Sequence, residues 1–470
     1  MEKAFEPTAA EVIIIGGGIT GLTLALLCEN EGIDWQLIEA ADKTGGVMQT
    51  LQHEGFVFEA GPNTGVLGKP EIAELFEMLE PDCTLHKARP EAANRWILLN
   101  GKWVAIPKGL IGGITTPLFT LYDKLRLLGE PWRAKGTNPM ETVAGLVRRR
   151  MGESYLKNVV DPFISGVYAG DPEKLVTRFA LPKLYQLEQN YGSFIGGALK
   201  KARIKVSERD KKVSREVFAA KGGFGNLISS IVDRLPAHRI MCSTKVERIE
   251  KSNHQFAVHI HSQNHSLQIL HSKQLVSTIG GYALPGLFSF VTHEEIEPIS
   301  NLCYAKVVQV AMAYKIWNGP KLNAFGGLIP SSEKRNVLGV LFPSSIFGDR
   351  APENGAMLSV FLGGIRRPDI FELNDTDLIA LVREEMKTLF NVHQDDEAFF
   401  RIFRYKNAIA QYDAATEERL KSIAVLEAKH PGLYLAGNIR DGIGIADRVQ
   451  QAFQLAQNVR NFSLNTESYA

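Results

Sequence analysis

The sequence predicts an α/β protein assembled from discontinuous segments, and three observations support this prediction. A β-branched run near the start leads into a glycine-rich turn and an apolar helical pattern. A similar order of strand, spaced glycines and helix, YLAGNIRDGIGIADRV, recurs at 434–449. Between them, residues 81–210 break the alternation of strands and helices with aromatic and leucine-rich stretches. We therefore expect the two ends of the chain to share one α/β unit, with other units inserted between them.

The composition is that of an ordinary globular protein. Of 470 residues, 45% are hydrophobic and 22% are charged, and the formal net charge is +1. Such a charge gives no domain-scale basic field, so we expect no nucleic-acid partner. The four cysteines form no CxxC pair, which indicates neither a disulfide scaffold nor a cysteine zinc site and suits the reducing cytoplasm. We expect no signal peptide. We also expect no spanning helix, because charges, glycines or prolines interrupt every apolar tract before roughly 18 residues.

The first glycine turn has the pattern of a dinucleotide cradle. The run Val12–Ile15 precedes Gly16, Gly18 and Gly21 in the spacing GxGxxG, and a helix, the strand WQLIE and Glu39 follow. Gly16 permits a sharp turn, Gly18 lets the backbone approach a pyrophosphate, and Gly21 lets the helix pack on the strand. Glu39 is placed to accept hydrogen bonds from a ribose. A turn that binds nothing is the alternative, which the flanking strand and acid make less favourable. This is the start of a Rossmann-like domain.

The next segment, KTGGVMQTLQHEGFVFEAGPNT at 43–64, is not needed by a nicotinamide dehydrogenase. Together with Glu39, the motif K43-x-G45-G46 and the stretch EGFVFEAGPN resemble the flavin amine oxidase superfamily. The resemblance implies FAD, with the GG segment along the cofactor and the GP segment beside the isoalloxazine ring. Lys43 departs from the usual arginine and offers a point charge in place of a bidentate fork.

The same resemblance explains the second glycine turn. In such enzymes the chain returns at its C-terminus to place a strand and a helix start near the flavin, where backbone donors stabilise negative charge. An ordinary strand, turn and helix is the alternative. Arg448 and Gln450-Gln451 stand where the family commonly has a cysteine and a Ser-Gly pair. The resemblance assigns the following residues to the cofactor: Gly16, Gly18, Ile19, Thr20, Gly21, Glu39, Lys43, Gly45, Gly46, Gly61, Pro62, Asn63, Val246, Gly437, Asn438, Gly444 and Ile445.

Segments in the middle of the chain resemble, in order, the porphyrinogen oxidase family. They are RWILLNGKWVAIP, GVYAGDPEKL, ALPKLYQLEQNYGS, GGFGNLISSIVDRL, LVSTIGG and LGVLFPSSIFGDRAP. The resemblance implies oxidation of protoporphyrinogen IX to protoporphyrin IX in haem synthesis, in three two-electron steps with oxygen or a quinone as acceptor. Four alternatives stay open: oxidation of coproporphyrinogen III, which would need a more basic slot, an amine oxidase, a carotenoid desaturase, and a flavoprotein that merely binds porphyrin or membrane. A homodimer is also left open.

Four residues are candidates for the substrate site. Arg95 could pair with a substrate propionate, because a guanidinium offers two donors in a plane, although a structural salt bridge is the alternative. Phe325 and Phe342 could line an apolar slot for the macrocycle, or could be ordinary core residues. Asn63 could orient a substrate nitrogen or a water that accepts the proton, since an amide is not itself a useful base.

The resemblance also implies three units. An FAD-binding domain is expected from 1–80, 215–290 and 420–470, a mixed-sheet substrate domain from 81–107 and 291–419, and a helical insertion at 108–214. In the family this insertion is membrane-associated, which implies a cytoplasmic protein with peripheral contact at the inner face of the membrane. The helical spacing of Leu118, Leu121, Leu125 and Leu128 in the insertion fits such a surface. A helical domain packed on the flavin domain is the alternative.

Two further features are interpreted as structural. His254, His259, His261, His265 and His271 crowd one stretch, but no carboxylates flank the pair in the strand FAVHIH, so we expect no metal site. The basic stretch KKARIKVSERDKKVSR at 200–215 is interpreted as a solvated linker, with anionic lipid or nucleic acid as the alternative partner.

Overall fold

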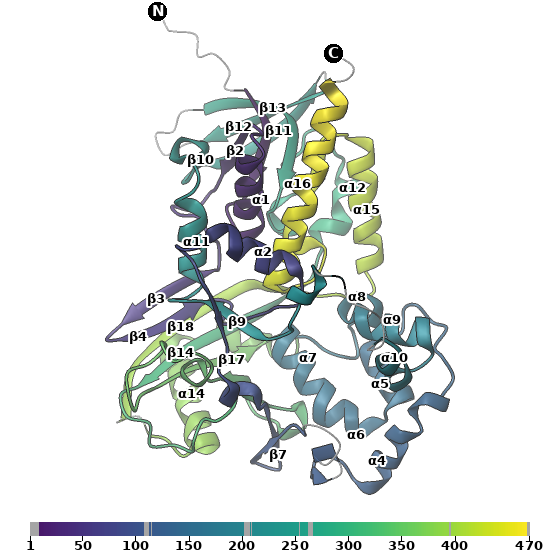
Figure 1. Ribbon diagram of the computed structural model, residues 1–470, viewed down its shortest axis with the longest axis vertical. Coiled ribbons are helices and arrows are strands. Elements are labelled where there is room, and N and C mark those ends of the chain that lie inside the picture. The colour runs from purple at the N-terminus through teal and green to yellow at the C-terminus, as the bar shows by residue number, and fades with distance from the viewer. Residues whose placement is uncertain are drawn as a thin grey trace, which may run out of the picture.

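Two seven-stranded sheets, one in the upper and one in the lower half of Figure 1, form the framework of the described chain. The structure is a computed structural model that describes residues 9–107, 112–113, 115–201, 207, 209–252, 254–261, 267–393 and 396–467. A group of short helices lies beside the lower sheet, at the lower right of Figure 1. The predicted α/β class with mixed sheets is confirmed.

The upper sheet is mostly parallel. Its order is β10 (Ile240–Met241), β2 (Trp35–Ile38), β1 (Ala9–Ile15), β13 (Leu267–Ser277), β12 (Gln255–His261) and β11 (Lys245–Ser252), and β19 (Leu433–Leu435) also pairs with β13. β10, β2, β1, β13 and β19 run parallel, whereas β12 and β11 are antiparallel to their neighbours. Val12–Ile15 are buried throughout, as expected for a parallel strand covered on both faces.

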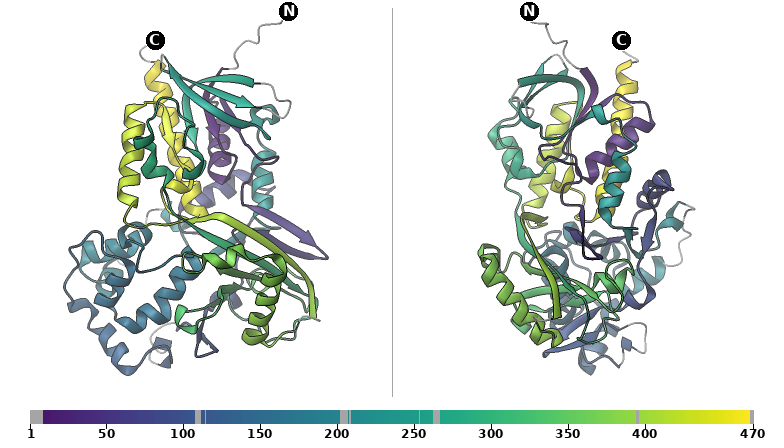
Figure 2. Two further views of the ribbon diagram at one scale, coloured as in Figure 1. Left: turned by 180° about the vertical axis from the view of Figure 1, so that it is seen from behind. Right: turned by 90° about the vertical axis from the view of Figure 1, so that its left-hand side faces the viewer.

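The two ends of the chain meet beside this sheet. α1 (Ile19–Asn30) packs against α16 (Ile445–Glu467), and Figures 1 and 2 show the two helices side by side. Leu22 and Ala25 of α1 share a buried cluster with Val449 and Ala452 of α16. On the other side, α15 (Thr416–Lys429) packs on α12 (His293–Ser300), whose Ile296 and Ile299 enter the second cluster of the upper sheet. The expected domain boundaries stay a prediction, and α12 packs with the upper sheet although it lies beyond residue 290.

The lower sheet is antiparallel except at one pair. Its order is β18 (Glu397–Ala410), β14 (Tyr304–Tyr314), β17 (Ala356–Gly363), β16 (Val337–Leu341), β15 (Gly326–Leu328), β7 (Trp96–Leu99) and β8 (Lys102–Ala105), with β15 and β7 parallel. α14 (Asp375–Phe390) covers one face, where Leu378 and Val382 share a cluster with Val310 and Leu358. The opposite face contributes Ala311 and other residues to a cluster with Phe56, Phe58 and Phe399.

Smaller strands join the two sheets. β3 (Gln49–His53) pairs with β4 (Phe56–Ala60), and β9 (Val217–Ala220) lies between β5 (Gly65–Val66) and β6 (Leu85–Lys87). α2 (Pro70–Leu79), α11 (Phe224–Val232) and α13 (Pro343–Ile346) complete this region. The described part of the basic stretch is held here, because Arg209 pairs with Glu71 and Glu74 and Lys212 pairs with Glu77 on α2.

The helical insertion consists of short helices. They are α4 (Leu121–Leu128), α5 (Val143–Arg150), α6 (Glu153–Tyr155), α7 (Asp161–Tyr168), α8 (Thr177–Ala180), α9 (Pro182–Tyr191) and α10 (Phe194–Lys201), with a π-helical turn at Leu156–Val160. Residues 108–111, 114, 202–206 and 208 of the expected insertion lie outside the described part. Within the described ranges, none of the helices is both long enough and apolar enough to cross a bilayer.

Buried ion pairs hold the insertion together. Arg150 is fully buried and pairs with Glu130, which is equally buried and also accepts hydrogen bonds from Ser193 Oγ (2.7 Å) and the Phe194 N–H (2.9 Å). Arg149 bridges Glu141 and Glu188 at 2.7 and 2.8 Å. Within the RRR motif at 148–150, Arg150 is thus buried, Arg149 is half-buried and Arg148 is exposed.

The expected absence of a metal site stays a prediction for the full chain. No group of three or more histidine, cysteine, aspartate or glutamate side chains that could hold a metal ion is found among the described residues. His259 and His261 lie on β12, where His259 is within 3.7 Å of Glu250 and His261 is exposed. His265 lies outside the described residues.

The two neighbouring arginines Arg150 and Arg148 should differ sharply in their contribution to stability. Arg150→Met leaves the buried Glu130 carboxylate without its counter-charge. The free energy of opening of α5 should therefore fall by about 3–5 kcal/mol. Arg148→Met removes only solvent-exposed pairs with Glu153 and Glu173 and should cost less than about 1 kcal/mol. Native-state hydrogen exchange of the α5 amides measures both values. Equal losses in the two variants would contradict a role for burial.

Candidate active site

The turn after β1 contains the three glycines of the GxGxxG spacing, and only the middle one, Gly18, has free space beside it. Gly16 has φ +103°, and a Cβ there would lie 2.6 Å from Thr278 Oγ1. A Cβ on Gly21 would lie 2.1 Å from the Gly16 carbonyl oxygen. A Cβ on Gly18 would meet nothing within 4 Å. The close contacts at Gly16 and Gly21 exclude any side chain, whereas the Gly18 backbone faces open space, as a pyrophosphate cradle requires.

The second glycine pair and Glu39 border this opening. The Gly45 N–H donates to the Gly17 carbonyl (2.7 Å), and a Cβ on Gly46 would lie 3.8 Å from Gly18 Cα. The Glu39 carboxylate accepts hydrogen bonds from the N–H groups of Gly17 (2.7 Å) and Ala41 (2.8 Å). Each of its oxygens keeps a further lone pair, so the anchored carboxylate can still accept from ribose hydroxyls.

Thr278 joins the first and last glycine turns. Its hydroxyl lies 3.0 Å from the carbonyl oxygens of both Ile15 and Gly16. A Cβ on Gly437 would lie 2.4 Å from the Thr278 carbonyl oxygen. One helical turn further, Thr20 Oγ1 donates to the Arg448 carbonyl at 3.4 Å, which ties the start of α1 to the start of α16. The segments 16–21 and 437–448 therefore form one site.

Arg448 and Gln451, which depart from the family pattern, fix the loop before α16. Gln451 accepts from the Gly437 N–H and donates to Asp441 Oδ2, both at 2.8 Å. Arg448 donates to the Gly442 carbonyl at 3.0 Å, and its buried Nε has no hydrogen-bond partner among the described residues. Burial lowers the pKa of this guanidinium. A cation buried in this way beside the open cradle suits an anionic cofactor.

The remaining cofactor candidates lie around the same site. Asn438 accepts from Tyr304 Oη at 3.0 Å, and the Gly444 N–H donates to Asp447 Oδ2 at 3.1 Å. Lys43 is exposed, and Val246 is half-buried on β11 against the core of the upper sheet. Ile19, Thr20 and Ile445 are buried in the first turns of α1 and α16. These contacts position the segments, while the direct cofactor roles stay predictions.

Gln309 clamps the turn at Gly61 to the lower sheet. Gly61 has φ +132°, and a Cβ there would lie 2.1 Å from the Val47 carbonyl oxygen. Gln309 on β14 is 1% exposed, accepts from the Gly61 N–H (3.1 Å) and donates to the Glu59 carbonyl (2.8 Å). One side-chain amide thus satisfies both backbone groups as a neighbouring strand would. Sequence reasoning missed Gln309, because no local pattern marks it.

Asn63 forms a second clamp. Its Nδ2 donates to the Gly61 carbonyl (3.1 Å), and its Oδ1 accepts from Ser359 Oγ on β17 (2.7 Å). Asn63 is buried and its amide oxygen is occupied by Ser359. These contacts position the Gly61–Pro62–Asn63 turn between two neighbouring strands, and a direct catalytic role for Asn63 stays a prediction.

The side chain of Glu59 anchors the other end of the turn. It accepts from Thr50 Oγ1 (2.6 Å) and from the Phe224 N–H at the start of α11 (3.1 Å), and it lies 3.3 Å from Arg350 Nη1. Glu59 and Arg350 are both buried. Burial raises the pKa of the Glu59 carboxyl, although the nearby Arg350 and the two hydrogen bonds act in the opposite direction.

A row of residues leads from Asn63 to Arg95 across the lower sheet. Ser359 on β17 pairs with Leu341 on β16, and Leu341 pairs with Gly326 on β15. Gly327 pairs with Trp96, which places the preceding residue, Arg95, beside Gly326. With ~4.8 Å between neighbouring strands, Ser359 and Arg95 are about 14 Å apart. Leu341 is half-buried in the middle of this row.

The two phenylalanine candidates, Phe325 and Phe342, lie in different environments. The guanidinium carbon of Arg95 lies 5.3 Å from the centroid of the half-buried Phe325 ring, so these two predicted residues are in contact. Phe342 is fully buried against Trp96 and Phe390, in the cluster under α14. Phe342 therefore occupies a core position, which was the alternative interpretation. Because side chains alternate along a strand, its neighbour Leu341 is the one on the Ser359 row.

Comparison with known proteins agrees with this geometry. Residues 19–459 match the model of the flavin-containing amine oxidoreductases. The chain belongs to this family. A chloroplastic protoporphyrinogen oxidase of Nicotiana tabacum is 27% identical over 97% of this chain and 86% of its own length. A coproporphyrinogen III oxidase of Bacillus subtilis (strain 168) is 26% identical over 94% and 96%.

Solved structures show the same fold. A UDP-galactopyranose mutase has a TM-score of 0.73 at 16% identity, covering 96% of this chain and 94% of its own. Cyclohexylamine oxidase from Brevibacterium oxydans has a TM-score of 0.70 at 15% identity, covering 97% and 99%. This chain of 470 residues is therefore an FAD-dependent oxidoreductase. The resemblance of its sequence to the porphyrinogen oxidases is confirmed. Gly16–Gly21, Glu39, Gly45–Gly46 and 437–445 are the segments that would hold FAD.

Replacing Gln309 should loosen the flavin site. Gln309→Leu leaves the Gly61 N–H and the Glu59 carbonyl buried without partners, at about 1–3 kcal/mol each. FAD should bind to the apoprotein at least about tenfold more weakly, with a shifted visible spectrum. The control is Gln411→Leu, which breaks buried hydrogen bonds to the carbonyls of Tyr168 and Ile409 without touching the turn. Titration of both apoproteins with FAD measures the effect, and equal behaviour of the two variants would argue against the clamp.

Proposed function

We propose that this chain oxidises protoporphyrinogen IX to protoporphyrin IX in haem synthesis. The proposal is supported by relatives with this name that match almost the whole chain. The observation on which it rests is the contact of Arg95 with Phe325, at the end of the row that starts at Asn63. A cation beside an aromatic ring suits a macrocycle that carries acidic arms on an apolar body.

The reaction removes six hydrogens from the substrate in three two-electron steps, and bound FAD would accept the electrons, with oxygen or a quinone as the final acceptor. The chain itself binds and orients. Arg95 would hold a propionate, while Phe325 and Leu341 would contact the macrocycle. Gln309 and Asn63 fix the turn that faces the flavin ring, so that substrate and ring meet in a defined orientation.

Coproporphyrinogen III is the second candidate substrate. Relatives in Bacillus subtilis and Staphylococcus aureus are named coproporphyrinogen III oxidases, at 26% and 24% identity over most of the chain. This substrate has two more carboxylates, and a basic pocket described in the next subsection favours it.

The direct test is anaerobic reduction of the holoenzyme by each porphyrinogen. The flavin absorbance should disappear fastest with the physiological substrate. Arg95→Ala should raise the KM for that substrate by about 10-fold or more, the equivalent of one charge-assisted hydrogen bond, with FAD content unchanged. Arg95→Lys should recover only part of the affinity, because an ammonium cannot form the bidentate pair.

Bleaching of the flavin by a polyamine or by phytoene, with no response to either porphyrinogen, would refute the proposal and assign an amine oxidase or desaturase activity. Loss of FAD from Arg95→Ala would show that Arg95 belongs to the cofactor site.

We also propose that α4 rests on a membrane surface. Leu121, Tyr122, Leu125 and Leu128 of α4, and Trp132 beyond its end, are 59–85% exposed, whereas Leu118 of the predicted spacing is buried. The spacing of three or four residues between Leu121, Leu125 and Leu128 places these side chains on one side of the helix. A stripe of large apolar side chains exposed in this way is typical of a helix that lies in a bilayer interface.

Leu125→Asp should therefore weaken binding to vesicles of phosphatidylcholine and phosphatidylglycerol by about 10-fold or more, because the apolar contact is lost and a like charge is added. Val425→Asp, at an equally exposed position on α15 next to the upper sheet, is the control and should leave binding unchanged. Vesicle sedimentation measures both. Wild-type protein that does not sediment with vesicles would exclude the membrane role.

A further inference from the structure

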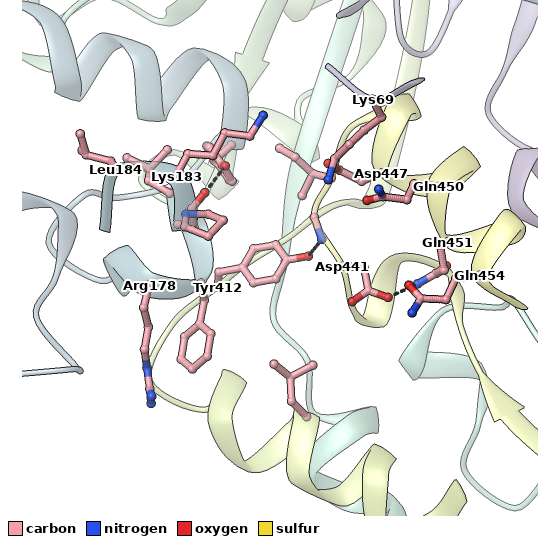
Figure 3. Close-up of a pocket in the computed structure, with 18 of the residues that line it drawn as sticks. Lys69, Arg178, Lys183, Leu184, Tyr412, Asp441, Asp447, Gln450, Gln451 and Gln454 are labelled. Atoms are coloured by element: carbon pink, nitrogen blue, oxygen red, sulfur yellow. Dashed lines mark hydrogen bonds between the residues drawn. The ribbon is translucent and has the colours of Figure 1, made fainter. Parts of the chain in front are cut away.

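A cavity of about 800 Å³ lies between the helical insertion and the last helix of the chain (Figure 3). α8 and α9 form one wall, and the loop before α16 together with the first three turns of that helix forms the other. Cavities of this size at the junction of structural units are typical of binding sites for ligands larger than a metabolite fragment.

The wall formed by α8 and α9 is mainly apolar, with Arg178 and Lys183 as its charged residues, and the opposite wall is mainly polar. Phe179, Leu184, Leu187 and other apolar residues come from α8 and α9. Gln450 and Gln454 project from α16 opposite them (Figure 3). A ligand that fits both walls has an apolar body and polar arms.

Two lysines in the lining of the cavity have no partner among the described residues. Lys69 precedes α2 and Lys183 lies on α9, and among the described residues neither forms an ion pair or a hydrogen bond with a protein group. The two lysines come from distant parts of the sequence, yet both line this cavity.

The other charged residues in the wall are already engaged. Arg178 pairs with Glu417 at 2.7 Å, and Asp441 pairs with Arg440 at 3.2 Å. Asp447 attracts Lys183, but its carboxylate also accepts the Gly444 N–H. The pocket therefore holds two ammonium groups against one partly engaged carboxylate.

The ends of the basic stretch add to the positive field. Burial lowers the pKa of the Lys183 ammonium group, and the positive charges of Lys69, Arg215 and Lys201 lower it further. An anion bound between Lys69 and Lys183 would relieve this repulsion, which makes the pocket selective for negatively charged groups.

The pocket shares a wall with the flavin site. Gly442 and Ile443 line it directly, and they precede Gly444 and Ile445, which begin the helix assigned to the flavin. Tyr412 also lines the pocket and accepts the Gly442 N–H at 2.8 Å (Figure 3). A ligand in this pocket is therefore separated from the flavin segment only by the loop 441–443.

We propose that this pocket binds carboxylate arms of the tetrapyrrole through Lys69 and Lys183, and so favours the substrate with four carboxylates over the substrate with two. This inference rests on the proposed porphyrinogen oxidation. Arg95 gives one anchor for a propionate, and the two lysines give a second anchor at a separate place. A macrocycle with more acidic arms can occupy both anchors in more orientations, which raises its affinity.

The test compares three porphyrinogens with the holoenzyme: coproporphyrinogen III with four carboxylates, protoporphyrinogen IX with two, and the uncharged methyl ester of the first. Lys69→Gln and Lys183→Gln should each raise the KM for coproporphyrinogen about tenfold, the equivalent of one charge-assisted hydrogen bond. The rise should be smaller for protoporphyrinogen and absent for the ester, and kcat should change little. Lys157→Gln is the control, since Lys157 is exposed, lies 3.9 Å from Glu153 in the same helical unit and does not line the pocket.

The outcomes separate the two proposals. If the wild type oxidises a porphyrinogen but both lysine variants keep its KM for every substrate, the pocket assignment is wrong and the proposed function stands. If the wild type oxidises none of the porphyrinogens, both proposals fail. Because a misfolded variant would also lose activity, the FAD content and melting temperature of each variant must match those of Lys157→Gln. Equal KM changes for the ester and the free acid would overturn the role of charge.

Discussion

The close approach of three backbone segments at Thr278 is the constraint on which the cofactor site depends. The Thr278 hydroxyl contacts the end of β1, and both Gly16 and Gly437 pack so tightly against this residue that a Cβ would overlap it. Residues at the two ends of the chain can share one site only because neither has a side chain there. The parallel pairing of β13 with both β1 and β19 brings these segments to the same edge of the upper sheet.

The side-chain amides of Gln309 and Asn63 connect the turn at Gly61 to the lower sheet. The turn at Gly61 belongs to the cofactor side, yet Gln309 and Ser359, which hold it, belong to β14 and β17. Buried hydrogen bonds of this kind are costly to leave unmade, so the two sheets keep a fixed relation at the point where flavin and substrate would meet. The row from Ser359 through Leu341 to Arg95 extends that relation towards the substrate.

The helical insertion has buried ion pairs in its interior and exposed apolar side chains on its surface. Arg149 and Arg150 pair with Glu130, Glu141 and Glu188, so only Arg148 of the RRR motif is exposed, and it pairs with acidic residues. The apolar residues of α4 face outward instead. Elsewhere on the insertion, α9 closes a pocket against α16, and Lys183 of α9 has no partner among the described residues. One insertion can thus serve both a membrane surface and the recognition of acidic substrate arms.

The sequence alone predicted the glycine turn of the expected cofactor cradle. Gly16, Gly18, Gly21 and Glu39 are readable because a tight turn before a helix restricts backbone angles locally, and glycine spacing records that restriction. The sequence also indicated the chemical class, since its motifs follow a known order. It could not decide which side chains of a strand face the expected substrate site, because a shift of one residue moves a side chain to the opposite face of the sheet. For this reason Leu341 lies on the row with Ser359, whereas its neighbour Phe342 lies in the core under α14. The tertiary structure alone brought Gln309 to Gly61, and Lys69 and Lys183 into one pocket, because the proximity of residues so distant in sequence depends on how whole strands and helices pack, and no local pattern encodes it.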